Sequence, residues 1–322
     1  MKRLFLLSAI AIVAICSSSC GSSSKQESQS DSASKPEPTK RHGWYNAPLY
    51  GDVESVVETE YELADKFGEV VRGDIKSCNK YLFNEAGDVV EKTEYDSDGS
   101  LRWKCICKYD SDGNGVEDAW YRSDGSLSWK YIYKYDSAGN QIEWANYDSD
   151  GSLDWKHIYK YDSAGNIIEE DIRNSDSSLD CKLIYRYDSE GNLIEVTEYN
   201  SDGSLNMTES GKYDSVGNVI EVARYNSDGL LDKKYTYKYD SEGNVVETAQ
   251  FNPDGSLGWK HIYKYDAEGN IVVEAEYKPD GSLDWKHIYK YDSLGSMVEM
   301  TKYSSEALLP VSQTVYEITY RK

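Results

Sequence analysis

Residues 238–263 read KYDSEGNVVETAQFNPDGSLGWKHIY, and most of the remaining chain is a series of variations on this stretch. The stretch opens with a basic residue followed by Tyr-Asp, and the same tripeptide returns every 26 residues. It starts at Lys108, Lys134, Lys160, Arg186, Lys212, Lys238, Lys264 and Lys290. A fixed period of roughly 20–50 residues is typical of repeat proteins, in which each unit buries its apolar face only against its neighbours. The sequence therefore predicts one tandem array.

Each period contains two turn signals. One is Asp-Ser-x-Gly-Asn, as in residues 162–166, and the other is Asp/Asn-Ser-Asp-Gly-Ser, as in residues 148–152. Asp or Asn caps the first position of a type I turn, and Gly accepts the left-handed conformation that follows. The segments between the turns have the alternating character of β-strands. The predicted fold is all-β, with tandem 26-residue β-hairpin repeats forming one long, twisted and coiled antiparallel meander sheet.

Strict alternation outward from these turns predicts which residues face one another. The expected pairs around one period are Tyr159–Glu169, Ala145–Trp155 and Glu143–His157. By the same rule every Trp of the array faces a small residue, as in Trp103–Thr93, Trp129–Ala119, Trp259–Ala249 and Trp285–Ala275. Since small beside large suits a packed sheet face, we expect the aromatic side chains to share one inward face.

The aromatic composition makes that face the candidate binding surface. The chain has 29 Tyr and 8 Trp but only 4 Phe, and amphipathic aromatics suit a surface that is half wet. The candidate binding row comprises Trp103, Trp129, Trp155, Trp259, Trp285, Tyr133, Tyr159, Tyr263 and Tyr289. Exposure discriminates two interpretations: fully buried rings would be core, whereas an open row would be a platform for glycans.

The N-terminal segment resembles a bacterial lipoprotein signal. Lys2 and Arg3 precede an apolar run over residues 4–15, and small residues surround Cys20, the expected lipid-attachment site. Ser17 departs from that pattern, which commonly has an aliphatic residue there, and an ordinary secretory signal is the alternative. The expected organisation is a signal peptide over 1–20, a disordered Ser/Lys/Pro linker over 21–45, degenerate β-repeats over 46–94, regular repeats over 95–303 and a capping strand over 304–322.

The phrase Tyr-x-Tyr-Asp-Ser-x-Gly-Asn-aliphatic-x-Glu resembles the YD repeat of Rhs-type bacterial surface proteins. It recurs in full at residues 159–169 and 237–247, with Gln141 or Ala267 as departures in other units. The resemblance implies a spiralling β-ribbon. The chain is also expected to differ from the large members of that family, because we expect no counterpart of their toxin or of their self-cleaving core. A looser similarity to choline-binding wall repeats lacks their shorter period and Gly-Trp signature.

Charge and residue chemistry narrow the function. A net charge of −22 disfavours nucleic acid and anionic membrane surfaces as partners. The His positions fit cross-strand pairs such as Glu247–His261, no metal-ligand set or cofactor site is evident, and Cys78, Cys105, Cys107 and Cys181 are expected as free thiols. We therefore predict no enzyme. The expectation is an outer-membrane lipoprotein of the cell envelope whose repeats bind or space a protein partner, with a carbohydrate-binding module as the alternative.

Overall fold

The computed structural model describes residues 48–66, 69–305 and 309–322, and the regular elements in them are all β-strands, which confirms the predicted all-β hairpin fold. The predicted signal, linker and Cys20 lie outside the described residues. The strands of the first half are β1 (Val53–Lys66), β2 (Glu69–Phe83), β3 (Val89–Tyr95), β4 (Leu101–Tyr109), β5 (Gly115–Arg122), β6 (Leu127–Tyr135), β7 (Gln141–Asp148), β8 (Leu153–Tyr161), β9 (Ile167–Asn174) and β10 (Leu179–Tyr187). Those of the second half are β11 (Leu193–Asn200), β12 (Leu205–Tyr213), β13 (Val219–Asn226), β14 (Leu231–Tyr239), β15 (Val245–Phe251), β16 (Leu257–Tyr265), β17 (Ile271–Tyr277), β18 (Leu283–Tyr291), β19 (Met297–Ser304) and β20 (Pro310–Tyr320).

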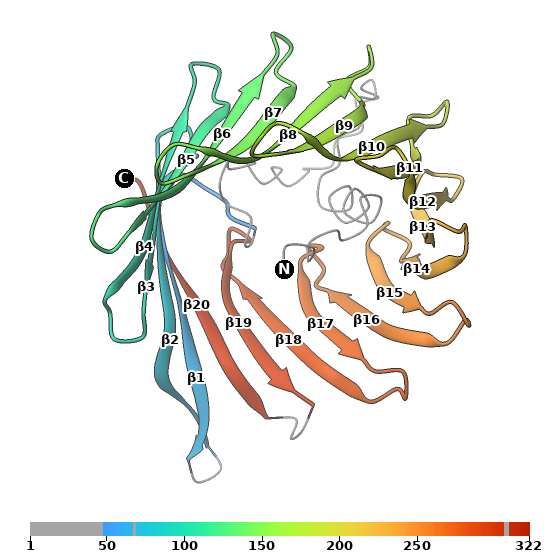
Figure 1. Cartoon of the computed structure of the whole chain (residues 1–322). Helices are drawn as coiled ribbons and strands as arrows, with labels where there is room; N and C mark the ends of the chain where they lie inside the picture. Colours follow the sequence, from blue (N-terminus) through green and yellow to red (C-terminus); the bar gives the residue numbers. More distant parts are fainter. Residues whose placement is uncertain (1–47, 67–68, 306–308) are drawn as a thin grey trace, which may run out of the picture. The chain divides into compact units, whose positions relative to one another are not determined.

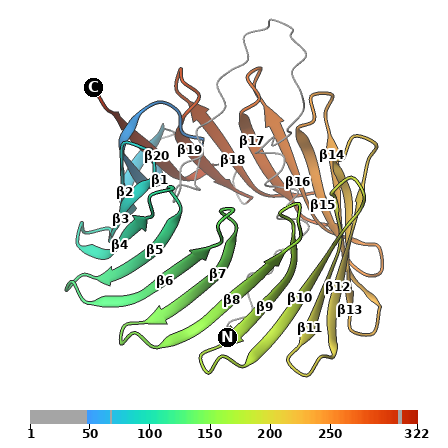
Figure 2. The ribbon, with the colours of Figure 1, turned by 90° about the horizontal axis from the view of Figure 1, so that it is seen from above.

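The described residues divide into two compact units. Unit 1 comprises residues 183–264 and 276–282, and unit 2 comprises the described residues up to 182 together with 265–275 and 283–322. Within unit 2, the successive hairpins from β5 to β9 lie side by side (Figure 2). Unit 1 repeats the same antiparallel pairing from β11 to β15.

Both turn signals form the predicted turns. In the turn over residues 162–166, the Gly165 amide donates to the Asp162 carbonyl at 3.2 Å, and the Asp162 amide donates to the Asn166 carbonyl at 2.9 Å. Gly165 has φ +87°, a conformation that costs a residue with a Cβ about 1–2 kcal/mol. Ser177 occupies the corresponding position of another turn with φ 66°. The turn chemistry that defines the period therefore folds as the residues predict.

The register beyond the turns differs from strict alternation. After Tyr161 pairs with Ile167, Lys160 pairs with Glu169, so that Ile168 is the extra residue of a β-bulge. A second shift follows the other turn, where Asp154 is extra. Each bulge moves the partner strand by one residue, and the expected pairs Tyr159–Glu169, Ala145–Trp155 and Glu143–His157 are therefore wrong. The observed pairs are Tyr159–Glu170, Asn146–Trp155 and Trp144–His157.

The same shift overturns the expected pairing of Trp with small residues. Trp103 pairs with Glu94, Trp129 with Trp120, and Trp259 with Gln250. The small residues instead pair with lysines on the opposite face, in the pairs Thr93–Lys104, Ala119–Lys130, Ala145–Lys156 and Ala249–Lys260. Ala119, Ala145 and Ala249 are buried there, where the aliphatic stems of neighbouring lysines suit a small partner.

Tyr and Asp of the repeated tripeptide have separate tasks. The hydroxyl of Tyr161 donates to the carbonyl of Gln141, twenty residues earlier, at 2.7 Å. The same bond joins Tyr109 to Val89, Tyr135 to Gly115, Tyr213 to Leu193, Tyr239 to Val219 and Tyr291 to Ile271. The carboxylate of Asp162 accepts the amide hydrogens of Ala164 and Asn166. In these six repeats Tyr thus ties the repeat to the preceding one, while Asp holds the turn.

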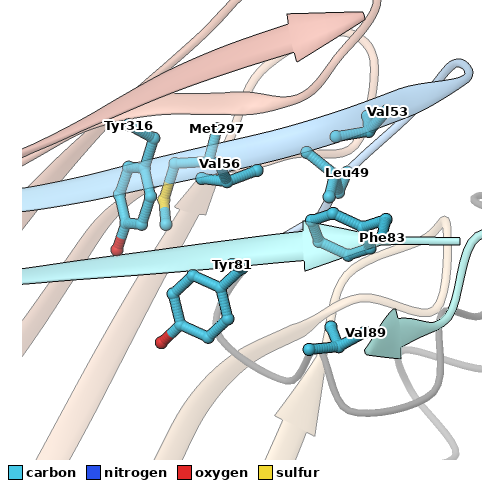
Figure 3. Close-up of a cluster of buried hydrophobic side chains, with 8 residues drawn as sticks. All are labelled: Leu49, Val53, Val56, Tyr81, Phe83, Val89, Met297 and Tyr316. Carbon is cyan, nitrogen blue, oxygen red and sulfur yellow. The ribbon is translucent and has the colours of Figure 1, made fainter. Parts of the chain in front are cut away.

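A cluster of buried apolar residues in unit 2 forms where early and late strands meet. Val53 and Val56 of β1 pack with Tyr81 and Phe83 of β2 and with Tyr316 of β20 (Figure 3). Leu49, Val89 and Met297 complete the cluster. β1 pairs antiparallel with both β2 and β20, as the blue and red strands of Figure 1 show. Here the sheet has a buried apolar core, whereas most side chains elsewhere in the strands are only half-buried.

Candidate functional site

The candidate row lies on one face of the sheet, which we call the aromatic face. On β8 of unit 2 it carries Trp155, His157 and Tyr159, and the bulges bring Trp144 and Asn146 of β7 onto the same face. Indole and imidazole rings contact one another there: the ring centres are 4.8 Å apart for Trp144–Trp155 and 5.1 Å apart for Trp155–His157. The rings therefore support one another across strands as well as along them.

The row continues across neighbouring strands of unit 2 with members that the sequence did not indicate. Trp129 stacks on Trp120 at 5.5 Å and contacts Trp103 edge-on at 5.1 Å. The ring centre of Tyr131 lies 5.9 Å from that of Trp144 and 6.1 Å from that of Trp155. Trp120, Trp144 and Tyr131 were missing from the expected row, Trp120 and Trp144 because strict alternation placed them on the opposite face. No local signal in the sequence would have placed Trp120 and Trp144, since the extra residues of the two bulges, Val116 and Ile142, are equally suited to regular strand positions.

Unit 1 carries a smaller row of the same kind. Trp259 and His261 have ring centres 4.5 Å apart, and Tyr235 lies 6.2 Å from Trp259. The expected cross-strand pair Glu247–His261 is wrong, because His261 pairs with Thr248 in the strand ladder and its Nε2 lies 2.6 Å from Glu276. Glu247 instead accepts a hydrogen bond from Lys238 on the other face. His261 and Trp259 thus belong to the aromatic face together with a carboxylate.

Carboxylates also accompany the rings in unit 2. His157 Nδ1 lies 2.5 Å from Glu170, and the hydroxyl of Tyr289 donates to Glu274 at 2.8 Å. Burial, followed by the nearby Glu170 carboxylate, raises the pKa of Tyr159. Burial likewise lowers the pKa of His287 to about 4, so this imidazole is neutral near pH 7. The face therefore combines apolar rings with acceptors and neutral donors.

The exposure of the aromatic side chains is intermediate between that of a buried core and that of an open binding platform. All nine residues of the predicted row are half-buried, and the side chains of His157 and His287 are each 19% exposed. Several polar atoms of the face have no hydrogen-bond partner among the described residues, namely Trp129 Nε1, Trp144 Nε1, Asn146 Oδ1 and His287 Nε2. A buried polar atom without a partner costs free energy, which a hydrogen bond would offset. These atoms have almost no exposed surface, so a ligand group reaches them only after neighbouring side chains move.

The opposite face has a different chemistry. Lysines pair with glutamates of the next strand, as in Lys134–Glu143 at 2.7 Å and Lys160–Glu169 at 2.6 Å. Each of these lysine side chains is more than half exposed. Such exposed pairs contribute little to stability and keep the face hydrated. We call this surface the ion-pair face; it provides control positions for any experiment on the aromatic face.

The four described cysteines are free thiols, as the sequence predicts. None of Cys78, Cys105, Cys107 and Cys181 forms a disulfide. Cys105 is buried, and its sulfur lies 3.9 Å from that of Cys107. A hydrogen bond between the two thiols, together with burial and the Asp118 carboxylate, raises the pKa of Cys107.

Comparisons with known proteins give distant likenesses. No family model matches the chain, and no curated protein matches it. Among solved structures, TcdB2-TccC3-TEV is 12% identical over 83% of this chain and 16% of its own, with a TM-score of 0.37. A porin-like protein from Bacteroides uniformis is 10% identical over 83% of this chain and 98% of its own, also with a TM-score of 0.37. TcdB2-TccC3 is 16% identical over 78% and 15%, with a TM-score of 0.34. The chain thus spans about a sixth of the TcdB2-TccC3 chains. In the part of the chain that the structure describes, no helix is long and apolar enough to cross a membrane.

Proposed function

We propose that this protein is a non-catalytic lipoprotein of a bacterial cell envelope, related to the YD-repeat proteins, whose aromatic face binds a protein partner. Cys20 carries the lipid in this proposal, and the linker over residues 21–45 spaces the repeats from the membrane. The observation that supports binding is the contrast between the two faces. One repeats half-buried Trp, His and Tyr beside carboxylates, and the other repeats hydrated Lys–Glu pairs.

The chemistry of the aromatic face suits a polypeptide. Trp and Tyr are enriched at protein interfaces because they bury a large area while losing few rotamers, and they pair apolar contact with a polar tip. Glu170 and Glu274 add acceptors within the rows. With a net charge of −22, the chain attracts partners with basic segments.

A second candidate, binding of glycans, is favoured by a different observation. The indole nitrogens of Trp129 and Trp144 and the amide oxygen of Asn146 have no partner among the described residues. A sugar presents a flat apolar side, which would contact the rings, and hydroxyl groups, which would reach these buried polar atoms once neighbouring side chains have moved.

One experiment distinguishes the two candidates. A photo-crosslinking phenylalanine replaces Tyr131 on the aromatic face or, as the matched control, Tyr147, whose ring lies under Lys130 on the ion-pair face. We expect a discrete protein adduct in intact cells from position 131 and none from position 147. Equal adducts from both positions would refute a face-specific partner.

The glycan candidate is tested with the purified chain. Peptidoglycan fragments and capsular polysaccharides are titrated while tryptophan fluorescence is recorded. Saturable quenching that disappears in Trp144→Ala, without a protein adduct at position 131, would replace the protein partner by a glycan. Absence of both adduct and quenching would reject the aromatic face as a binding surface.

A further inference from the structure

Three donor atoms of unit 2 converge on the aromatic face near its apolar cluster. Cys105 and Cys107 project from β4, and Asp118 of β5 is the cross-strand partner of Cys107. The two sulfurs and a carboxylate oxygen all lie within 4.8 Å of one another. Cys105 is only 2% exposed, and Cys107 packs against the apolar cluster. This is a compact group of soft and hard ligands within a largely apolar setting.

The geometry points to a binding site for a borderline-soft divalent cation of the zinc type, held by Cys105, Cys107 and Asp118. Two thiolates at about 2.3 Å from a tetrahedral zinc ion are separated by about 3.8 Å, and the two sulfurs are 3.9 Å apart. The sulfurs therefore already have the spacing of a bound pair. The carboxylate oxygen lies within 4.8 Å of both sulfurs and needs to approach each to about 3.5 Å when the cation binds.

The next strand supplies a partner that orients the carboxylate. The hydroxyl of Tyr133 on β6 donates to Asp118 Oδ2 at 3.0 Å, and the carboxylate also accepts a hydrogen bond from the Cys107 thiol, which ends when a cation replaces the thiol proton. Tyr131 is the cross-strand neighbour of Asp118 in the same ladder. Carboxylate ligands of metals are commonly held by such outer hydrogen bonds, and their loss typically lowers metal affinity by about 10–100-fold.

Comparison along the chain shows what is specific to this repeat. The positions of Cys105, Cys107 and Asp118 correspond, 52 residues later, to His157, Tyr159 and Glu170. In that later repeat the carboxylate contacts the imidazole directly, at 2.5 Å. The earlier repeat has two thiols in place of two rings, so a pair of soft ligands lies beside the corresponding carboxylate, Asp118. Soft sulfur ligands select zinc-like ions over magnesium or calcium.

Binding is a simple exchange of protons for metal. Two thiols lose their protons, two metal–sulfur bonds and one metal–oxygen bond form, and a solvent molecule completes the tetrahedron. No electron is transferred. Because the ligands must be deprotonated, each bound cation releases two protons, and affinity rises with pH.

The test uses the full chain, reduced with a non-thiol reagent, and Co²⁺ as the spectroscopic probe. We expect one equivalent of Co²⁺ with thiolate-to-metal absorption, competed by Zn²⁺ and accompanied by release of two protons into weak buffer. The double substitution Cys105→Tyr and Cys107→Tyr copies Tyr131 and Tyr133 of the next repeat, so it should fold, as circular dichroism will check. It should lose one equivalent of Co²⁺.

Matched variants sharpen the assignment. Cys78→Ser and Cys181→Ser should bind as the parent chain does, and thiols outside the described residues are common to every protein compared. Asp118→Asn should bind at least about 10-fold more weakly, and Tyr133→Phe about 10-fold more weakly. Retention of the full cobalt stoichiometry by the folded double variant would overturn the site. So would thiol counting that shows a Cys105–Cys107 disulfide which persists until reduction and no cobalt binding afterwards.

Discussion

The ion pair between Glu209 and Arg224 allows a direct test of whether this sheet buries a charged pair, as the structure shows. Glu209 is fully buried in unit 1, and its Oε1 accepts two hydrogen bonds from Arg224, at 2.8 and 2.7 Å. Its Oε2 has no hydrogen-bond partner among the described residues. Removing one partner of a buried pair leaves an uncompensated charge, which typically costs about 3–5 kcal/mol, whereas replacing both by apolar residues is often neutral or stabilising.

The perturbation is therefore a double-mutant cycle. Arg224→Ile introduces the residue found at the corresponding position 172, and Glu209→Leu introduces the residue found at position 183. We expect Arg224→Ile alone to lower the free energy of unfolding by about 3–5 kcal/mol, and the double variant to recover it fully.

Urea unfolding followed by far-ultraviolet circular dichroism measures the effect. At a slope of about 3 kcal/mol/M, the expected loss moves the midpoint down by about 1 M or more. The control is Arg186→Ile, which removes an exposed pair with Glu195 in the same unit and should cost less than about 1 kcal/mol. If Arg224→Ile unfolded at the same urea concentration as the parent chain, the buried charge pair would not exist in solution and the reasoning would fail.

Four further predictions follow from the turns, the repeat contacts and the N-terminal segment. Ser177→Gly relieves a left-handed Ser (φ 66°) and should raise the free energy of unfolding by about 0.5–1 kcal/mol in thermal unfolding. Tyr161→Phe leaves the Gln141 carbonyl without its hydroxyl donor and should lower that free energy by about 0.5–1.5 kcal/mol; an unchanged urea midpoint would contradict the contact. Hydrogen bonds from the Asn166 side chain and backbone lower the pKa of Asp162 in the folded chain. Its stabilising effect is therefore complete above the unfolded value of about 4 and is lost as pH falls through the lower folded pKa. Asp162→Asn keeps the turn, as Asn226 does in its own turn, and should show a smaller loss of melting temperature on acidification than the parent chain. Cys20→Ala should abolish incorporation of radioactive palmitate and release the exported protein from membranes; continued labelling would identify a different attachment residue.

The turns of this fold could be predicted from the sequence, but the register could not. Asp162, Gly165 and Asn166 have local preferences strong enough to specify their turn without help from distant residues. The bulge at Ile168 has no such signature, since Ile is equally suited to a regular strand position. Ile168 is 38% exposed, and the choice between alternation and bulge depends on packing across several strands.

The candidate site shows the same division. Trp103, Trp129 and Trp155 were identified because they recur at one position of the period. Trp120, Trp144 and Asp118 come from the intervening strands, which the bulges shift by one residue. Strict alternation placed Glu117, not Asp118, opposite Cys107, so the sequence could not reveal that two thiols and a carboxylate converge.

The pairing of β1 with β20 has a consequence for the order of folding. Glu62 pairs with Ser312, and Arg321 binds Asp52 through its amide and its guanidinium, so the first strand obtains its second neighbour from the far end of the sequence. At a synthesis rate of about 5–20 residues per second, the intervening chain takes about 12–50 s to be made. During that interval one edge of β1 presents unpaired amides and carbonyls, the arrangement that recruits strands from other chains. A cell that makes this protein must therefore either keep the nascent chain unfolded until residues 310–320 are available or shield the edge of β1 from other chains.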